Sequence, residues 1–297
     1  MKKGRVGIVI VNYNGANYQN EALRTIYCST YKNNEIIIVD SGSSDNSVEL
    51  AKSEYPDVHF LIQNENVGVA KGNNIGIHYA FDKLDVEYVL LINNDIILDE
   101  NTLENLINES DEKTVVVPKI LFYCPNDVIW YAGGKMLWHR GEARHVGVHE
   151  KDVGQYDVEG YVTYSPTCCM LLHRNILEKV GDIDEKMFMY FDDVDLCVRI
   201  TDAGAKIKYV PSAKMWHKVS SSSGGMESKT FVYYNFRNRL YFLDKYSKKL
   251  LFPARIYTYS KMLAKFVLSP IYKKNDKYIY KAWRDYCVGK TGRCDEW

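Results

Sequence analysis

The stretch "RVGIVIVN" (residues 5–12) is a continuous apolar run that ends in an asparagine. Such a run is typical of a strand that is buried on both faces within a parallel sheet. It is followed by "NYQNEALRTIYCS" (17–29), which has apolar residues at helical spacing, and then by a second apolar run, "NEIIIVD" (34–40). A strand, a helix and a second strand in this order predict a right-handed β-α-β unit with parallel strands.

The same alternation continues further along the chain. Residues 43–55 and 68–84 have helical patterns, while 58–64 and 86–93 read as the third and fourth strands. Ser43 or Ser44 is the expected N-cap of the second helix. Residues 115–175 read as shorter strands of a mixed sheet, interrupted by a polar loop between Trp138 and Val158. The pattern therefore predicts an α/β protein, parallel in its first half.

Composition limits the class of protein. A chain of 297 residues fits one large α/β domain with an appended segment. Lys and Arg together number 38, as do Asp and Glu, so a global basic field for nucleic acid is excluded. Seven cysteines without C-x-x-C spacing favour a reducing compartment. The first apolar run is too short for a signal peptide, and no run reaches the ~18 apolar residues of a membrane span. We therefore expect a cytoplasmic protein.

Polar, turn-forming residues follow each of the four predicted strands. They are Asn12–Gly15, Asp40–Gly42, Asn64–Asn66 and Asn93–Asp95. Ordinary turn preferences could explain any one of these clusters. Four in series favour a binding edge, because ligands of open parallel sheets bind at the carboxyl ends of the strands.

Two common phosphate loops are absent. Gly68, Gly72 and Gly76 are spaced four residues apart, which differs from the dinucleotide fingerprint G-x-G-x-x-G. Their spacing instead predicts one helix face that packs closely on the sheet. The stretch "VGKTG" (288–292) lacks the first glycine of a P-loop, since residue 284 is arginine.

Taken together, these and later motifs resemble the family 2 glycosyltransferases. The resemblance rests on "VIVNYNG" (9–15), "IIVDSGSSDNS" (37–47), "NENVGVAKGNNIGI" (64–77), "LLINNDI" (90–96), "FMYFDDVDLCVRI" (188–200), "MWHKVSSSS" (215–223) and "YYNFRNRLYF" (233–242). Their order and spacing agree over residues 5–245. Among subgroups, the chain looks most like bacterial rhamnosyltransferase-type enzymes that build cell-surface polysaccharides.

The resemblance implies a GT-A fold, which is a Rossmann-like, mainly parallel mixed sheet flanked by helices. It implies a glycosyltransferase domain at 1–245, with a nucleotide-binding half (1–110) and an acceptor-binding half (111–245). Residues 246–297 would form a C-terminal amphipathic helical segment. This segment is basic and aromatic, which fits contact with the inner face of the plasma membrane, docking on the domain, or docking on a second subunit.

The implied donor site lies at the strand ends. By resemblance, Val11, Asn12 and Tyr13 line the base and ribose, and Asp40 accepts the imide N–H of uracil or thymine in a UDP- or dTDP-sugar. A capping role for the following helix is the alternative for Asp40. Gly68 would let backbone approach the ligand. Lys71 would either reach a phosphate or stay in solvent.

The cluster Asn93-Asn94-Asp95 stands where the family has an Asp-x-Asp motif that holds a divalent cation. Asp95 would be the remaining carboxylate ligand for Mg²⁺ or Mn²⁺, and Asn93 or Asn94 would contact ribose or donor. His217, expected just beyond a strand at 205–210, would complete the metal site, with the Ser/Gly-rich stretch after it as a lid. His145 and His149 read as loop residues.

Three carboxylates, Asp192, Asp193 and Asp195, begin a predicted helix, and the helix dipole alone could explain one or two of them. By resemblance, Asp193 is the catalytic base of an inverting transfer to a glycan or lipid-linked acceptor, and Asp192 orients it. Acceptor sugars could stack on Trp130, Tyr131 or Trp138, although we expect at least one of these to be buried.

Two other functions share part of this pattern. A nucleotidyltransferase normally needs a basic, Gly-rich loop after the first strand, and "NYNGANYQN" (12–20) has no Lys or Arg. A non-catalytic carbohydrate-binding protein with a decayed site is suggested by Asn93. The joint presence of Asp95, Asp193 and His217 argues against decay.

Overall fold

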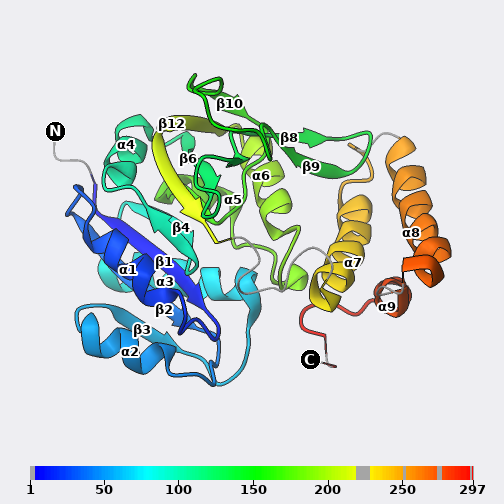
Figure 1. Cartoon of the computed structure of the whole chain (residues 1–297), viewed down its shortest axis with the longest axis horizontal. Helices are drawn as coiled ribbons and strands as arrows, with labels where there is room; N and C mark the ends of the chain where they lie inside the picture. Colours follow the sequence, from blue (N-terminus) through cyan, green and yellow to red (C-terminus); the bar gives the residue numbers. More distant parts are fainter. Residues whose placement is uncertain (1–3, 219–227, 250–251, 273–275, 295, 297) are drawn as a thin grey trace.

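The computed structural model describes residues 4–218, 228–249, 252–272, 276–294 and 296. Its centre is a mixed sheet with the strand order β10-β12-β6-β11-β4-β1-β2-β3 (Figure 1). The strands are β1 (Val6–Asn12), β2 (Asn34–Asp40), β3 (His59–Ile62), β4 (Tyr88–Asn93), β5 (Ile96–Leu98), β6 (Thr114–Phe122), β7 (Ile129–Tyr131), β8 (Gly134–Leu137), β9 (Glu142–His145), β10 (Gly160–Val162), β11 (Cys169–His173) and β12 (Lys206–His217).

Helices cover this sheet and extend beyond it at the C-terminal end (Figure 1). They are α1 (Gln19–Tyr27), α2 (Ser47–Glu54), α3 (Gly68–Leu84), α4 (Thr102–Glu109), α5 (Arg174–Val180), α6 (Asp192–Asp202), α7 (Lys229–Lys245), α8 (Pro253–Tyr272) and α9 (Asp276–Cys287), with a 3-10 turn at Glu185–Met187. Within the described residues, every helix is too short or too polar to cross a bilayer.

The first half of the sheet is parallel, as predicted. Strand β1 pairs with β2 on one side and β4 on the other, in a register that aligns Asn12 with Asp40 and Val11 with Asn93. The polar strand ends therefore lie at one edge. The predicted glycine face of α3 is also confirmed, because a Cβ atom at Gly72 would lie 2.7 Å from the side chain of Val11.

The second half makes the sheet mixed. Strand β11 lies antiparallel between β4 and β6, and β6 is parallel to β12. The carboxyl ends of β6 and β12 consequently share the edge formed by those of β1, β2 and β4. Strand β12 does not end at residue 210 as expected. After an irregularity at 211–213 it continues to His217, which pairs with Ile96.

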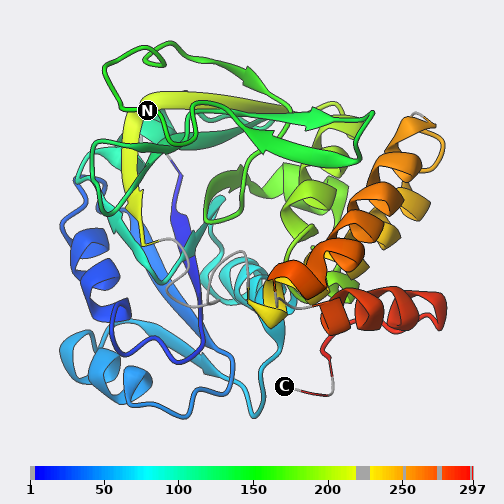
Figure 2. The ribbon, with the colours of Figure 1, turned by 45° about the vertical axis from the view of Figure 1, so that its right-hand side comes forward.

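The C-terminal helices have their own apolar core. Side chains of α7 such as Tyr234 and Leu240 pack there with Ala254 and Met262 of α8 and with Ile279 of α9. Figure 1 and Figure 2 show α8 and α9 at the end of the molecule remote from β3. The predicted C-terminal helical segment is thus helical, and it docks on α7. The proposed domain boundary at 245 remains a prediction.

Two local expectations were wrong. Helix α2 begins at Ser47 with Asn46 as its N-cap, because the side chains of Ser43 and Ser44 bond elsewhere: the Ser43 hydroxyl donates to Asp40 and the Ser44 hydroxyl to Oδ1 of Asn14. His145 belongs to β9, which pairs with β8, and is not a loop residue. His149 does lie in a loop, stacked on Phe122.

Candidate active site

Hydrogen bonds tie together the ends of three strands. The Nδ2 atom of Asn94 donates to Oδ1 of Asn12 over 2.7 Å, and Nδ2 of Asn12 donates to Oδ2 of Asp40 over 2.8 Å. All three side chains are buried. This network holds the ends of β4, β1 and β2 in fixed positions, so the edge is a preorganised surface.

The Asp40 carboxylate also organises its own loop. It accepts the backbone N–H of Ser43 over 2.9 Å and the Ser43 hydroxyl over 2.6 Å. Asp40 is buried and already accepts these hydrogen bonds within the protein. Tyr13 is 43% exposed beside this loop, and Val11 is half-buried.

The start of α3 completes this part of the edge. Gly68 has a φ of +79°, which favours glycine, and a Cβ atom there would collide with Phe188. The close backbone approach at Gly68 is therefore to Phe188. Lys71, one turn into α3, is exposed.

Asp95 and His217 form the predicted pair. Oδ1 of Asp95 lies 3.0 Å from Nε2 of His217, and Nδ2 of Asn93 lies 3.4 Å from the same ring nitrogen. Asp95 and His217 are both buried, and the Lys218 amide bonds the Asp95 carbonyl over 2.9 Å. Nδ1 of His217 is buried with no hydrogen-bond partner in the described part of the chain.

This pair fits a divalent cation. Mg²⁺ usually takes one or two protein carboxylates together with substrate phosphates and water. Within the described ranges no three His, Cys, Asp or Glu residues gather as a closed metal cage. One carboxylate and one imidazole that already face each other form a partial ligand set, which a diphosphate would complete. The predicted lid after His217 falls in 219–227, outside the described residues.

Asp193 is held by a tyrosine that the sequence did not indicate. The Tyr164 hydroxyl donates to Oδ2 of Asp193 over 2.6 Å, and Oδ1 of Asp193 accepts the Val194 amide over 2.8 Å. Burial raises the pKa of Asp193, and the hydrogen bond from Tyr164 opposes this rise.

Asp192 and Asp195 have different surroundings. Burial, together with the charge of Asp193, raises the pKa of Asp192 to about 8, which favours the protonated form of Asp192 at neutral pH. Asp195 forms ion pairs with Arg199 and Lys245.

An aromatic and imidazole row connects the two carboxylate sites. The Trp130 ring meets His217 edge-on at 4.8 Å between centroids and His145 at 4.6 Å, and His145 stacks on Tyr164 at 5.7 Å. Burial lowers the pKa of His145, which favours the neutral imidazole. Of the predicted sugar-stacking residues, Tyr131 is fully buried, as expected for at least one of them.

The loop before α6 has an unusual backbone that α7 stabilises. Phe188, Tyr190 and Phe191 have φ angles of 63°, 63° and 68°, a region that costs non-glycine residues about 1–3 kcal/mol each. Nδ2 of Asn238 lies 2.7, 2.8 and 2.9 Å from the carbonyl oxygens of Met187, Met189 and Tyr190. Asn238 thus fixes the loop that leads into Asp192 and Asp193.

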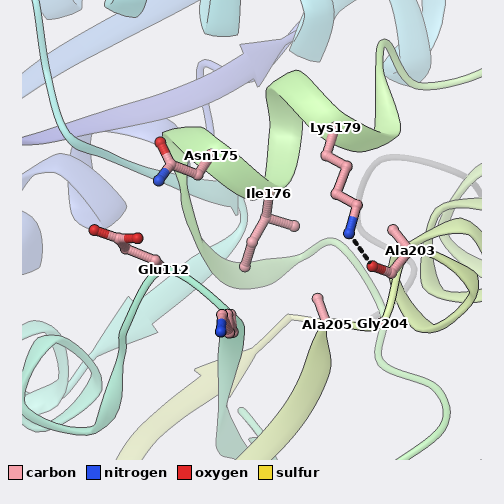
Figure 3. A pocket seen from close by; sticks show the side chains of 8 residues that line it. Glu112, Asn175, Ile176, Lys179, Ala203, Gly204 and Ala205 are labelled. Atoms are coloured by element: carbon pink, nitrogen blue, oxygen red, sulfur yellow. Dashed lines mark hydrogen bonds between the residues drawn. The ribbon is translucent and has the colours of Figure 1, made fainter.

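A cavity of about 310 Å³ lies elsewhere. Lys113 and Ala205, at the amino ends of β6 and β12, line it together with Asn175 and Ile176 (Figure 3). Lys179 reaches across it to the Ala203 carbonyl (Figure 3). Because it lies at the amino ends of these strands, the cavity is separate from the polar edge.

Residues 7–181 match the model of the family described as glycosyl transferase family 2. The chain belongs to this family. Among relatives of this family 2 glycosyltransferase, the low-salt glycan biosynthesis hexosyltransferase Agl10 of Haloferax volcanii is 25% identical over 283 residues, which cover 93% of this chain and 88% of Agl10. The dTDP-rhamnosyl transferase RfbF of Shigella flexneri is 24% identical, covering 85% of this chain and 84% of RfbF.

The expected GT-A fold is confirmed by a solved structure. GalNAc-T7 with UDP, GalNAc and Mn²⁺ superposes with a TM-score of 0.65 at 15% identity. The alignment covers 97% of this family 2 glycosyltransferase and 58% of the GalNAc-T7 chain, so the present chain spans little more than half of that structure. At this identity the likeness shows the fold alone.

Proposed function

We propose that this glycosyltransferase moves a sugar from a nucleotide-diphosphate donor to a glycan or lipid-linked acceptor in the cytoplasm, with inversion at the anomeric carbon. The observation that carries the proposal is the meeting of two carboxylate sites at one sheet edge. Asp95 faces His217 in one of these sites. From His217, ring contacts run through Trp130 and His145 to Tyr164, whose hydroxyl donates to Asp193 in the other site. Sugar transfer needs one site that stabilises the leaving diphosphate and a neighbouring site that activates the acceptor hydroxyl.

The donor is proposed to be a dTDP- or UDP-sugar, with rhamnose as one candidate. A relative is named for dTDP-rhamnose transfer, and a solved structure of the same fold holds UDP. The preorganised ends of β1 and β2, with Val11, Asn12, Tyr13 and Asp40, would receive the nucleoside. Gly68, Lys71, Asn93 and Asn94 would lie along the rest of the donor.

Asp95 and His217 would hold Mg²⁺ or Mn²⁺ against the diphosphate. When bound, the cation offsets the negative charge that develops on the leaving diphosphate. The Asn93 amide lies beside the same imidazole and would orient the donor. Burial of Asp95 and His217 excludes water from the protein side of this pair.

Asp193 would act as the general base. Its carboxylate takes the proton of the acceptor hydroxyl while the hydroxyl oxygen bonds to the anomeric carbon, and the bond from that carbon to the diphosphate oxygen breaks on the opposite side. Asp192 keeps its own proton at neutral pH, so the two neighbours do not both carry charge. Tyr164 holds the reacting carboxylate in one orientation.

A thermal-shift screen tests the donor. Because a ligand that binds the folded state raises the melting temperature, UDP-, dTDP- and GDP-sugars should be compared with Mn²⁺ and with EDTA. We expect a uridine or thymidine donor to stabilise the protein in Mn²⁺ and far less in EDTA. The anomeric configuration of the product, read by NMR, then tests inversion. Stabilisation by GDP-sugars alone would overturn the donor assignment.

A further inference from the structure

Helix α8 has one packed face and one bare face. Ala254, Thr258 and Met262 recur every fourth residue and are buried against the core shared with α7. The opposite side, together with the residue just before the helix, carries a row of apolar side chains that are 44–82% exposed and that we call the α8 stripe: Phe252, Ile256, Tyr259, Leu263 and Val267. Steps of three and four residues place the whole row on one side of the helix.

The chain's charge is distributed unevenly. Residues 246–297 contain 12 Lys and Arg against four Asp and Glu, whereas residues 1–245 contain 26 against 34. The neutral whole therefore consists of an acidic body and a C-terminal segment with a formal net charge of +8, of which Lys249, Arg255 and Lys261 form ion pairs with carboxylates of the body. The α8 stripe lies within this basic segment.

We propose that the α8 stripe docks on an anionic lipid surface. Stable attachment of a helix that lies on a bilayer needs both an apolar face and electrostatic attraction, and this segment has both. The neighbouring α9 adds exposed Tyr280 and Trp283, whose amphipathic rings suit the headgroup region. The acidic body is repelled by the same surface, so the molecule binds with its C-terminal helices toward the lipid.

A second copy of this chain suits the α8 stripe less well. A two-fold symmetric interface brings identical patches together, so a dimer through α8 would place two segments of charge +8 side by side. Like charges in contact oppose association, whereas anionic headgroups complement the segment. The charge of the segment therefore favours lipid.

Vesicle sedimentation with the full chain tests this. Vesicles of phosphatidylcholine alone are compared with vesicles that also contain phosphatidylglycerol. We expect binding to the anionic vesicles, a decrease as salt is added, and little binding to the neutral ones. The double variant Ile256→Glu/Leu263→Glu should bind at least about tenfold more weakly, because two apolar anchors are withdrawn from lipid. Val158→Glu, on a loop valine that is 78% exposed, is the control and should bind like the unaltered protein.

Three results would overturn the proposal. One is undiminished vesicle binding by the double variant. Another is binding of the unaltered protein that changes neither with salt nor with the phosphatidylglycerol content of the vesicles. This measurement does not depend on the folding of a variant. The third is a lipid-free dimer, seen by light scattering, that the double variant dissociates, since this would assign the α8 stripe to a second copy. None of these measurements depends on transferase activity.

Discussion

The Tyr164 hydroxyl lies 2.6 Å from Oδ2 of Asp193 and donates a hydrogen bond to it. These residues are 29 positions apart, on the segment before β11 and on α6. The bond stabilises the ionised carboxylate and therefore counteracts the rise in the Asp193 pKa that burial causes. It couples the position of the segment before β11 to the basicity of the proposed base.

Tyr164→Phe should move the pH profile. Without the donor the pKa of Asp193 rises further, so the base is protonated at a higher pH and the acidic limb of kcat/KM shifts upward. At neutral pH we expect kcat to fall about tenfold. Tyr131→Phe is the control, because its hydroxyl donates to the Tyr164 carbonyl rather than to Asp193. An equal shift in both variants would contradict a specific role for Tyr164.

Asp193→Asn removes basicity while keeping size. If Asp193 takes the acceptor proton, kcat should fall by at least ~10² while the donor Kd, measured by calorimetry, stays nearly unchanged. Asp192→Asn should retain most activity, because Asp192 already holds a proton at neutral pH. A dead Asp192→Asn enzyme beside an active Asp193→Asn enzyme would reverse the assignment.

Asp95→Ala and His217→Ala should weaken donor binding only where the cation contributes. We expect at least about tenfold weaker binding of the nucleotide diphosphate in Mn²⁺, and little change in EDTA. Calorimetry in EDTA and at several Mn²⁺ concentrations gives the Kd of the nucleotide diphosphate without and with the cation. Asp99→Ala, a carboxylate just beyond β5, is the control. The metal assignment fails if all three variants respond to Mn²⁺ like the unaltered protein.

Asn238→Ala should affect catalysis through the loop at 186–191. It leaves three carbonyl oxygens without their shared donor, which costs about 1–3 kcal/mol of unfolding free energy. Because that loop positions Asp193, kcat should drop more than donor affinity. Asn105→Ala removes a similar amide bond, to the Ser212 carbonyl on the far side of the sheet, and should leave kcat intact. Unaltered kcat in a folded Asn238→Ala protein would rule out the positioning role.

Local pattern was enough to predict much of the fold. Continuous apolar runs such as 5–12 are typical of strands inside a covered sheet, and the helical spacing of Gly72 and Gly76 predicts close packing of their helix on β1. Both depend on neighbours along the chain, and the structure confirms both. The Ser43 and Ser44 caps failed because those hydroxyl groups bond across the sheet edge to Asp40 and Asn14, competitors that lie outside the helix.

The α/β architecture with its parallel first half, the polar edge at the strand ends and the resemblance to family 2 glycosyltransferases could all be recognised from the amino-acid sequence. Which side chains meet at that edge depends on contacts between distant parts of the chain. His217 comes within 3.0 Å of Asp95 from 122 residues away, because β12 continues past its irregularity to pair with β5. Tyr164 and His145 lie in stretches of sequence that show neither a motif nor a regular hydrophobic periodicity. Their roles arise from the pairing of distant strands, and periodicity, which senses only near neighbours, carries no information about such contacts.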